Sequence, residues 1–103
     1  MARFDIYRAA KRNSRVAYLL DVQDDGLSSI LKTRVVVPLV RVTDSLPAAR
    51  RLHPEFRIGG KSYAAIMPEL AGVPVEALGA KVASAAERHF EIVDALDFVF
   101  QGY

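Results

Sequence analysis

The spacing of apolar residues changes once along the chain, and that change limits the folds that the chain can adopt. Over residues 3–75, short runs rich in β-branched and aromatic residues alternate with turn residues, which predicts several short antiparallel strands. From residue 82 onward, apolar residues recur at spacings of three and four, which predicts an amphipathic helix. The sequence therefore predicts a mostly β fold, either a small curled barrel or an α+β sheet, with one C-terminal helix.

Two runs near the N-terminus predict a hairpin. Residues 3–9 alternate apolar and charged side chains, and residues 16–23 are β-rich and mostly apolar. Asn13 and Ser14 lie between them among charged residues, and these residue types favour the tip of a turn.

The middle of the chain predicts further strands. Residues 33–42 contain Pro38, which has no N–H for a ladder and so indicates an edge, a bulge or a switch between strands. Gly59-Gly60 is typical of a tight hairpin turn, here before a strand at 62–67. Residues 71–75 predict one more short strand.

The helix prediction depends on one apolar face, which falls within an arc of roughly 140° at about 100° per residue. That face consists of Val82, Ala85, Ala86, His89, Ile92, Val93, Leu96, Val99 and Phe100. Phe98 lies outside the arc, beside Glu91 and Asp94. A large apolar group there predicts that a partner covers it or binds it.

Length and cysteine content indicate how the fold is stabilised. The 103 residues predict a single domain over 1–103, too small to be very stable alone. The chain has no cysteine, hence no disulfide and no cysteine metal site, and no cofactor is expected. A homodimer is therefore expected. The first residues lack the apolar core of a signal peptide, and no run approaches the ~20 apolar residues that span a bilayer, so the expected location is the cytoplasm.

The sequence shows no catalytic motif of a known type. His89 is expected to be a packed core histidine, and His53 a turn residue rather than a base. Asp21, Asp24 and Asp25 are expected to form a solvated turn rather than a magnesium site. These patterns alone indicate a small interaction module.

A basic cluster in the first hairpin has two interpretations, a solvated loop or a docking surface for an acidic peptide or for phosphates. Its members are Arg8, Lys11, Arg12 and Arg15. The net charge of only +2 does not indicate a nucleic-acid-binding domain.

Segments spread over nearly the whole chain together resemble the CcdB family, the toxins of plasmid-type toxin–antitoxin pairs. They are FDIY near the N-terminus, LLDVQ at 19–23, VVVPL at 35–39, LHPEFRIGGKSY at 52–63, AGVPVEALG at 71–79 and IVDALDFVFQGY at the end. They occur in the family's order and nearly at its spacing, with about one extra residue between Gln23 and Val35.

The resemblance implies a homodimeric SH3-like barrel closed by a C-terminal helix. It implies a toxin without catalysis, which binds the A subunit of DNA gyrase and traps the complex in which gyrase has cut DNA. It also implies a CcdA-like antitoxin with a charged, disordered segment, and repression of the operon by the toxin–antitoxin pair. DNA would be contacted only through that pair.

The resemblance also assigns residues. The gyrase-binding positions correspond to Gly26, Leu27, Asp97, Gln101, Gly102 and Tyr103. Gln101 stands where the family has tryptophan, and Tyr103 where it has isoleucine. The basic cluster of Arg8, Lys11, Arg12 and Arg15 is the expected antitoxin-binding surface.

Two alternatives remain open. One is a CcdB-fold protein with weakened or redirected toxicity. The other is an endoribonuclease like the related MazF toxins, with a site recruited from His53, Arg50 and Arg51.

Overall fold

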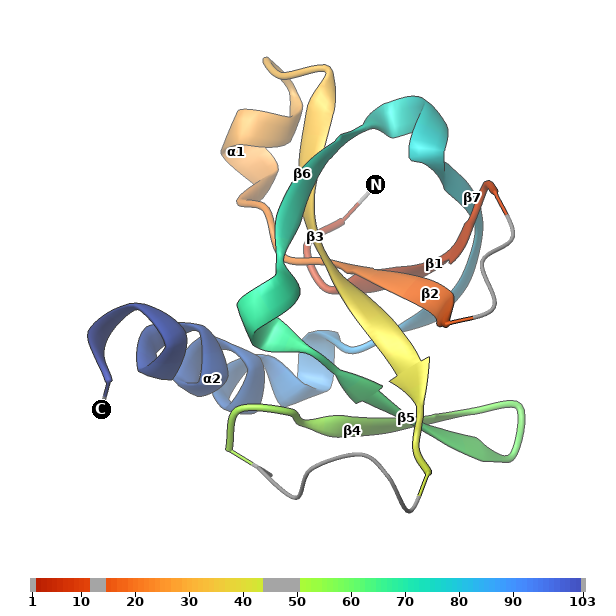
Figure 1. Cartoon of the computed structure of the whole chain (residues 1–103). Coiled ribbons are helices and arrows are strands. Elements are labelled where there is room, and N and C mark those ends of the chain that lie inside the picture. The colour runs from red at the N-terminus through yellow and green to blue at the C-terminus, as the bar shows by residue number, and fades with distance from the viewer. Residues whose placement is uncertain (1, 12–14, 44–50, 103) are drawn as a thin grey trace.

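The computed structural model describes residues 2–11, 15–43 and 51–102 (Figure 1). The strands are β1 (Asp5–Ala9), β2 (Val16–Asp21), β3 (Thr33–Arg41), β4 (Glu55–Ile58), β5 (Lys61–Ala65), β6 (Ala71–Pro74) and β7 (Leu78–Ser84). The α-helices are α1 (Asp25–Ser28) and α2 (His89–Gln101). Short 3₁₀ helices are η1 (Met67–Glu69), η2 (Val75–Ala77) and η3 (Ala86–Arg88).

All the described strands belong to one antiparallel, seven-stranded sheet in the order β4-β5-β3-β2-β1-β7, and β6 pairs with β3 outside this path. In Figure 1 β3, β6, β7, β1 and β2 follow one another around a ring, and α2 lies below it with the C-terminus pointing away. The sheet is thus a curled half-barrel with one long C-terminal helix, which confirms the predicted fold class.

Pro38 marks the point where β3 changes partners. One edge of β3 pairs with β2, and the other pairs first with β6, up to Val36, and then with β5, from Leu39. The Pro38 carbonyl accepts a hydrogen bond from Ile66 N–H at 3.0 Å. In a strand, the backbone N and C=O of one residue face the same neighbouring strand. The Pro38 nitrogen, which has no hydrogen to donate, therefore faces the edge of β3 where β6 ends and β5 begins. Of the three possibilities that Pro38 indicates, an edge, a bulge or a switch, the structure shows a switch between strands.

Both predicted hairpins are present. β1 pairs with β2, although the expected tip at Asn13 and Ser14 lies outside the described residues. In the β4–β5 hairpin, Gly59 and Gly60 have φ of 60° and 80°, which suits a turn that needs two left-handed residues.

The predicted start of the C-terminal helix is wrong. Val82 lies in β7, Ala86 lies in η3, and α2 begins only at His89. β7 pairs with β1, for example Ala83 with Ile6, so strand pairing prevails over the helical spacing of Val82. The sequence carries no start signal at this point, because no side chain caps α2.

The core lies between the sheet and α2, and the helix contributes a narrow face to it. Ile92 and Ala95 are fully buried, and Val99 packs against the core from its edge. Two predictions for this face are wrong, because His89 is exposed and Phe100 is 71% exposed. The buried arc is narrower than the apolar pattern indicates.

Candidate partner-binding surfaces

The first predicted site, Gly26 and Leu27, forms part of α1 rather than an irregular loop. Asp24 caps this helical turn, and its Oδ2 accepts the Gly26 N–H at 2.9 Å. A Cβ on Gly26 would come within 2.9 Å of that same oxygen, so the cap favours glycine here.

An apolar patch that the sequence reasoning missed surrounds this site. Leu27, Ile30 and Leu31 are all exposed, with Ile30 at 75%. Their spacing of three and four is that of one side of a helical turn, and this signal could have indicated the patch.

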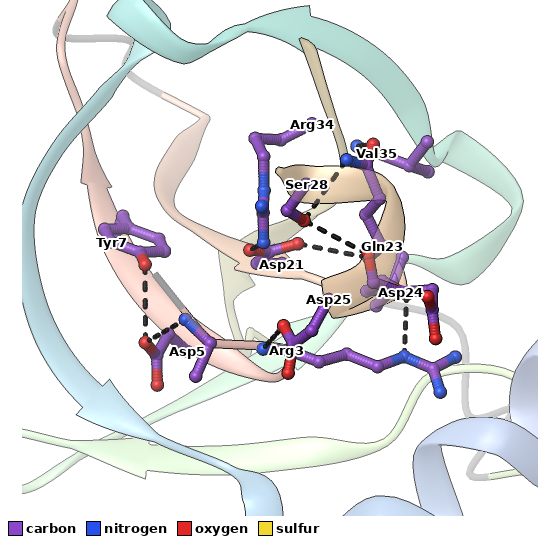
Figure 2. Close-up of polar contacts among 12 residues, drawn as sticks. Arg3, Asp5, Tyr7, Asp21, Gln23, Asp24, Asp25, Ser28, Arg34 and Val35 are labelled. Carbon is purple, nitrogen blue, oxygen red and sulfur yellow. Dashed lines mark hydrogen bonds and ion pairs between the residues drawn. The ribbon is translucent and has the colours of Figure 1, made fainter. Parts of the chain in front are cut away.

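A buried polar network supports α1 from inside the barrel (Figure 2). Arg34 forms an ion pair with Asp21, and these side chains are 2% and 0% exposed. Asp21 Oδ1 also accepts the Gln23 N–H at 3.1 Å. The Gln23 amide then accepts from Val35 N–H at 3.1 Å and donates to Ser28 Oγ at 3.3 Å. The network therefore ties α1 to β3.

The prediction that Asp21 lies in a solvated turn is wrong, since this carboxylate is buried. Burial raises the pKa of Asp21, against the hydrogen bond from Arg34 that lowers it. Asp25 instead accepts the Arg3 N–H at 2.7 Å. The acidic residues of this segment thus hold the local structure together.

A second buried carboxylate, that of Asp5, lies on β1, the strand that pairs with β2 beside Asp21. Asp5 accepts the Tyr7 hydroxyl at 3.3 Å and pairs with Lys81 Nζ at 3.3 Å. Burial, and then the Asp5 charge, raise the pKa of Tyr7 to about 12. Tyr7 therefore stays protonated near neutral pH and acts as a hydrogen-bond donor.

The second predicted site is the exposed C-terminal end of α2. Asp97 and Gln101 are exposed. Gly102 caps the helix with φ of 78° and donates its N–H to the Phe98 carbonyl at 2.9 Å. That left-handed conformation favours glycine, although a Cβ would meet nothing within 4 Å. Tyr103 lies outside the described residues.

The two sites are not adjacent within one chain. Figure 1 places α1 and α2 apart, with β6 and η1 between them. Arg3 and Phe4 run between the two helices: Arg3 bonds to Asp25, and the Phe4 ring stacks on His89 at 6.0 Å between centroids. Phe4 has φ of 71°, an unusual backbone conformation for phenylalanine.

Phe98 has a cover within its own chain, contrary to the prediction that a partner supplies it. The Arg51 guanidinium lies 4.5 Å from the centre of the Phe98 ring. The same guanidinium bonds to Asp94 through Nε at 2.9 Å and Nη2 at 3.1 Å. The Phe98 ring and the Asp94 carboxylate, which lie one helical turn apart, thus both contact the Arg51 guanidinium.

The basic cluster is divided. Arg8 and Lys11 are exposed, whereas Arg15 binds both Glu69 oxygens, at 2.6 and 2.8 Å. The Arg15 hydrogen bonds lower the pKa of Glu69. Arg12 lies outside the described residues.

A largely apolar pocket of roughly 430 Å³ lies beside Lys11. Its other lining residues are Ala9, Ala10, Leu19, Pro74, Glu76 and Ala77.

His53 lines a smaller pocket, of roughly 310 Å³, at the base of α2. The Nδ1 atom of His53 is buried and has no hydrogen-bond partner within the described ranges. The nearby cation Arg88 already binds Glu91, at 2.6 Å, and lies over the Phe56 ring at 4.1 Å. Neither Arg88 nor Arg51 is thus an unpaired cation, and Arg50 lies outside the described residues.

The family model of the CcdB protein matches residues 3–102, which include every described strand and helix. The chain belongs to the CcdB family. This CcdB-family chain is therefore a toxin of the toxin–antitoxin class, as the resemblance implied.

Solved structures show the same fold at low sequence identity. The Mycobacterium tuberculosis toxin MazF-mt6 has a TM-score of 0.73 at 15% identity, over 93% of this chain and 95% of that one. An endoribonuclease in complex with its cognate antitoxin, from a mycobacterial species, has a TM-score of 0.75 at 14% identity, over 97% and 94%. At these identities the likeness concerns the fold alone. None of the described helices is long and apolar enough to cross a membrane.

Proposed function

We propose that this CcdB-family toxin binds the A subunit of DNA gyrase and traps the gyrase–DNA cleavage complex, without catalysis of its own. The observation that carries the proposal is the end of α2. The family match extends to Gly102, and Asp97, Gln101 and Gly102 lie exposed at the end of a helix anchored by Ile92. A rigid, exposed helix end suits recognition of a folded partner.

Gln101 changes how this surface can bind. A tryptophan at this position would supply a large apolar anchor, whereas glutamine supplies hydrogen bonds and little area. The exposed Leu27, Ile30 and Leu31 offer apolar area at α1. Gly26 and Leu27 are therefore proposed as the second part of the gyrase-binding surface, with Tyr103 completing the first.

We propose that a CcdA-like antitoxin neutralises the toxin at the first hairpin. Arg8 and Lys11 are exposed cations, and the apolar pocket beside Lys11 can take a side chain of an acidic segment. Arg12 and Arg15 are included in the proposal, although Arg15 would have to exchange Glu69 for the antitoxin.

The remaining proposals concern assembly and biological setting. A homodimer is proposed because a domain of 103 residues leaves the apolar patches on α1 and α2 exposed. The toxin–antitoxin complex would repress its own operon and maintain a plasmid in the bacterial cytoplasm.

A cleavage assay tests the proposed target. Purified toxin is incubated with gyrase and supercoiled plasmid, and linear DNA is measured after denaturation and proteolysis. The expected result is accumulation of linear DNA that requires the A subunit, and Gln101→Trp should increase it. Absence of both cleaved DNA and binding to the A subunit would contradict the proposal.

A ribonuclease is the second candidate, favoured by the fold shared with the two structures above and by the His53 Nδ1, which has no hydrogen-bond partner among the described residues. The cation that such a site would need is already paired, because Arg51 binds Asp94 and lies over the Phe98 ring. Purified protein should leave RNA intact. RNA cleavage lost in His53→Ala or Arg51→Ala would replace gyrase poisoning with RNA hydrolysis.

A further inference from the structure

The apolar residues at α1 are held in place without apolar packing of that helix. We call Leu27, Ile30 and Leu31 the α1 patch, and all three are exposed. No residue of α1 itself is buried, so no side chain of the helix anchors it in the core. Ile30 and Leu31 donate their N–H groups to the Leu27 carbonyl at 3.0 and 2.9 Å, so the patch is one unit with α1. Polar contacts to the rest of the chain therefore set its orientation.

Two hydrogen bonds join side chains of α1 to neighbouring segments within the described residues. Asp25 accepts the Arg3 N–H at 2.7 Å, in a bond that is exposed to water. Ser28 Oγ accepts from Gln23 Nε2 at 3.3 Å, and Gln23 is only 4% exposed. Water competes less for the bond of a buried amide, so the Gln23 contact is the firmer of the two.

Gln23 lies just beyond the end of β2 and bonds in two directions (Figure 2). The Val35 carbonyl accepts the Val22 N–H at 3.0 Å, and Gln23 Oε1 accepts the Val35 N–H at 3.1 Å. The same amide donates through Nε2 to Ser28. A carboxylate would lack the donor, and an apolar side chain would lack both groups. Glutamine is therefore suited to join β3 to α1.

The buried ion pair fixes the backbone of Gln23. Its N–H donates to Asp21 Oδ1 at 3.1 Å, and the other oxygen of Asp21 pairs with Arg34. Buried ionic groups can specify one arrangement of a structure, because leaving either group unpaired is costly. A continuous series of contacts thus leads from the core through Gln23 to Ser28.

We propose that Gln23 is a positioning residue for gyrase binding. Its bond to Ser28 holds the α1 patch in the orientation that the A subunit accepts, while Gln23 itself is too buried to contact the subunit. A surface that is already oriented loses less conformational entropy on binding. This inference rests on the proposed function, in which Leu27 contacts the subunit.

Ser28→Ala tests the inference, because it removes the α1 end of the bond and leaves Gln23 and the buried ion pair in place. Affinity for the purified gyrase A subunit is measured by biolayer interferometry on the full chain. Binding should weaken roughly 3- to 10-fold, the range that one hydrogen bond contributes. Alanine favours a helix more than serine does, so a purely local role of Ser28 predicts no such loss.

Ser29→Ala is the matched control, because the Ser29 hydroxyl bonds to the Gly26 carbonyl of α1 itself, at 3.0 Å. It should leave affinity within roughly 2-fold, and both alanine variants should melt near the wild-type temperature. Ser28→Thr keeps the hydroxyl and should bind as the wild type does. In a Leu27→Ala chain, Ser28→Ala should weaken binding less than in the wild type, because it acts through the patch.

The other outcomes are distinct. If Ser28→Ala binds as the wild type does, or if Ser29→Ala weakens binding equally, Gln23 does not position the patch, while the proposed function stands. An undiminished effect of Ser28→Ala in the Leu27→Ala chain would mean that Ser28 acts independently of the patch, which also overturns the inference. Wild type that does not bind the subunit overturns the proposed function and the inference together.

Discussion

The two flanks of α2 are chemically similar and differ in what covers them. On one flank, Asp94 and Phe98 are covered by Arg51 of the same chain. On the other, Asp97 and Phe100 have the same groups and no arginine among the described residues. The difference teaches that apolar and charged residues on a helix do not by themselves mark a binding face. We expect a binding face only where no other part of the described chain covers them.

The buried face on which both flanks depend should give the largest effect. Ile92→Ala leaves a cavity at a fully buried position, and the free energy of unfolding should fall by about 2–5 kcal/mol. Urea denaturation measures this loss, and growth inhibition should fall with it. A loss of growth inhibition without a loss of stability would mean that Ile92, rather than either flank, contacts the target.

The covered flank should show a smaller loss, confined to stability. Phe98→Ala removes a half-buried ring and the surface on which Arg51 packs, so the free energy of unfolding should fall by about 1–2 kcal/mol. Adding Arg51→Ala should cost less in that variant than in the wild type, because the two side chains share one contact. If the losses in the free energy of unfolding were additive, they would contradict the comparison of the two flanks, because Arg51 would then stabilise the fold independently of Phe98.

The open flank should show almost no change in stability. Phe90→Ala should alter the free energy of unfolding by less than about 0.5 kcal/mol, because the side chain is already in solvent. Thermal unfolding by circular dichroism checks this. A loss as large as that of Phe98→Ala would show that the two flanks are equally structural.

The Arg15–Glu69 pair should give the smallest effect, visible only as a pH dependence. Arg15 lowers the folded-state pKa of Glu69, so this stabilisation is present above the ordinary glutamate pKa and is lost as the pH falls through the lowered one. The difference in melting temperature between wild type and Glu69→Gln should therefore shrink on acidification. A difference that grows at low pH would show that Glu69 is stabilised as the neutral acid.

Local signals allowed much of the fold to be predicted. Pro38 and Gly59-Gly60 impose backbone conditions that few structures meet, and both predictions are confirmed. β7 was missed because its small residues pair with β1, which lies more than 60 residues away, and local spacing carries no record of such pairing. The exposure of Phe100 was missed because periodicity gives the direction of a side chain but not the width of the surface that meets it.

The candidate surfaces were predictable to a lesser extent. The positions at Gly26 and Asp97 follow from the family resemblance and are exposed, but their roles await the experiments above. The ion pairs Arg15–Glu69 and Arg51–Asp94 join residues that are distant in sequence, so local patterns do not predict them. The buried Asp21–Arg34 pair was missed for the same reason, because a run of aspartates resembles a solvated turn until its partner is known.

The most direct test of the account is the affinity for the gyrase A subunit of a chain that lacks Gly102 and Tyr103. The account predicts that binding weakens roughly 100-fold or more while the melting temperature falls only slightly, since the deletion removes the Gly102 cap and the binding tip but leaves the helix anchored by Ile92. Wild-type affinity in the truncated chain, or a loss of binding fully matched by a loss of folding, would contradict it.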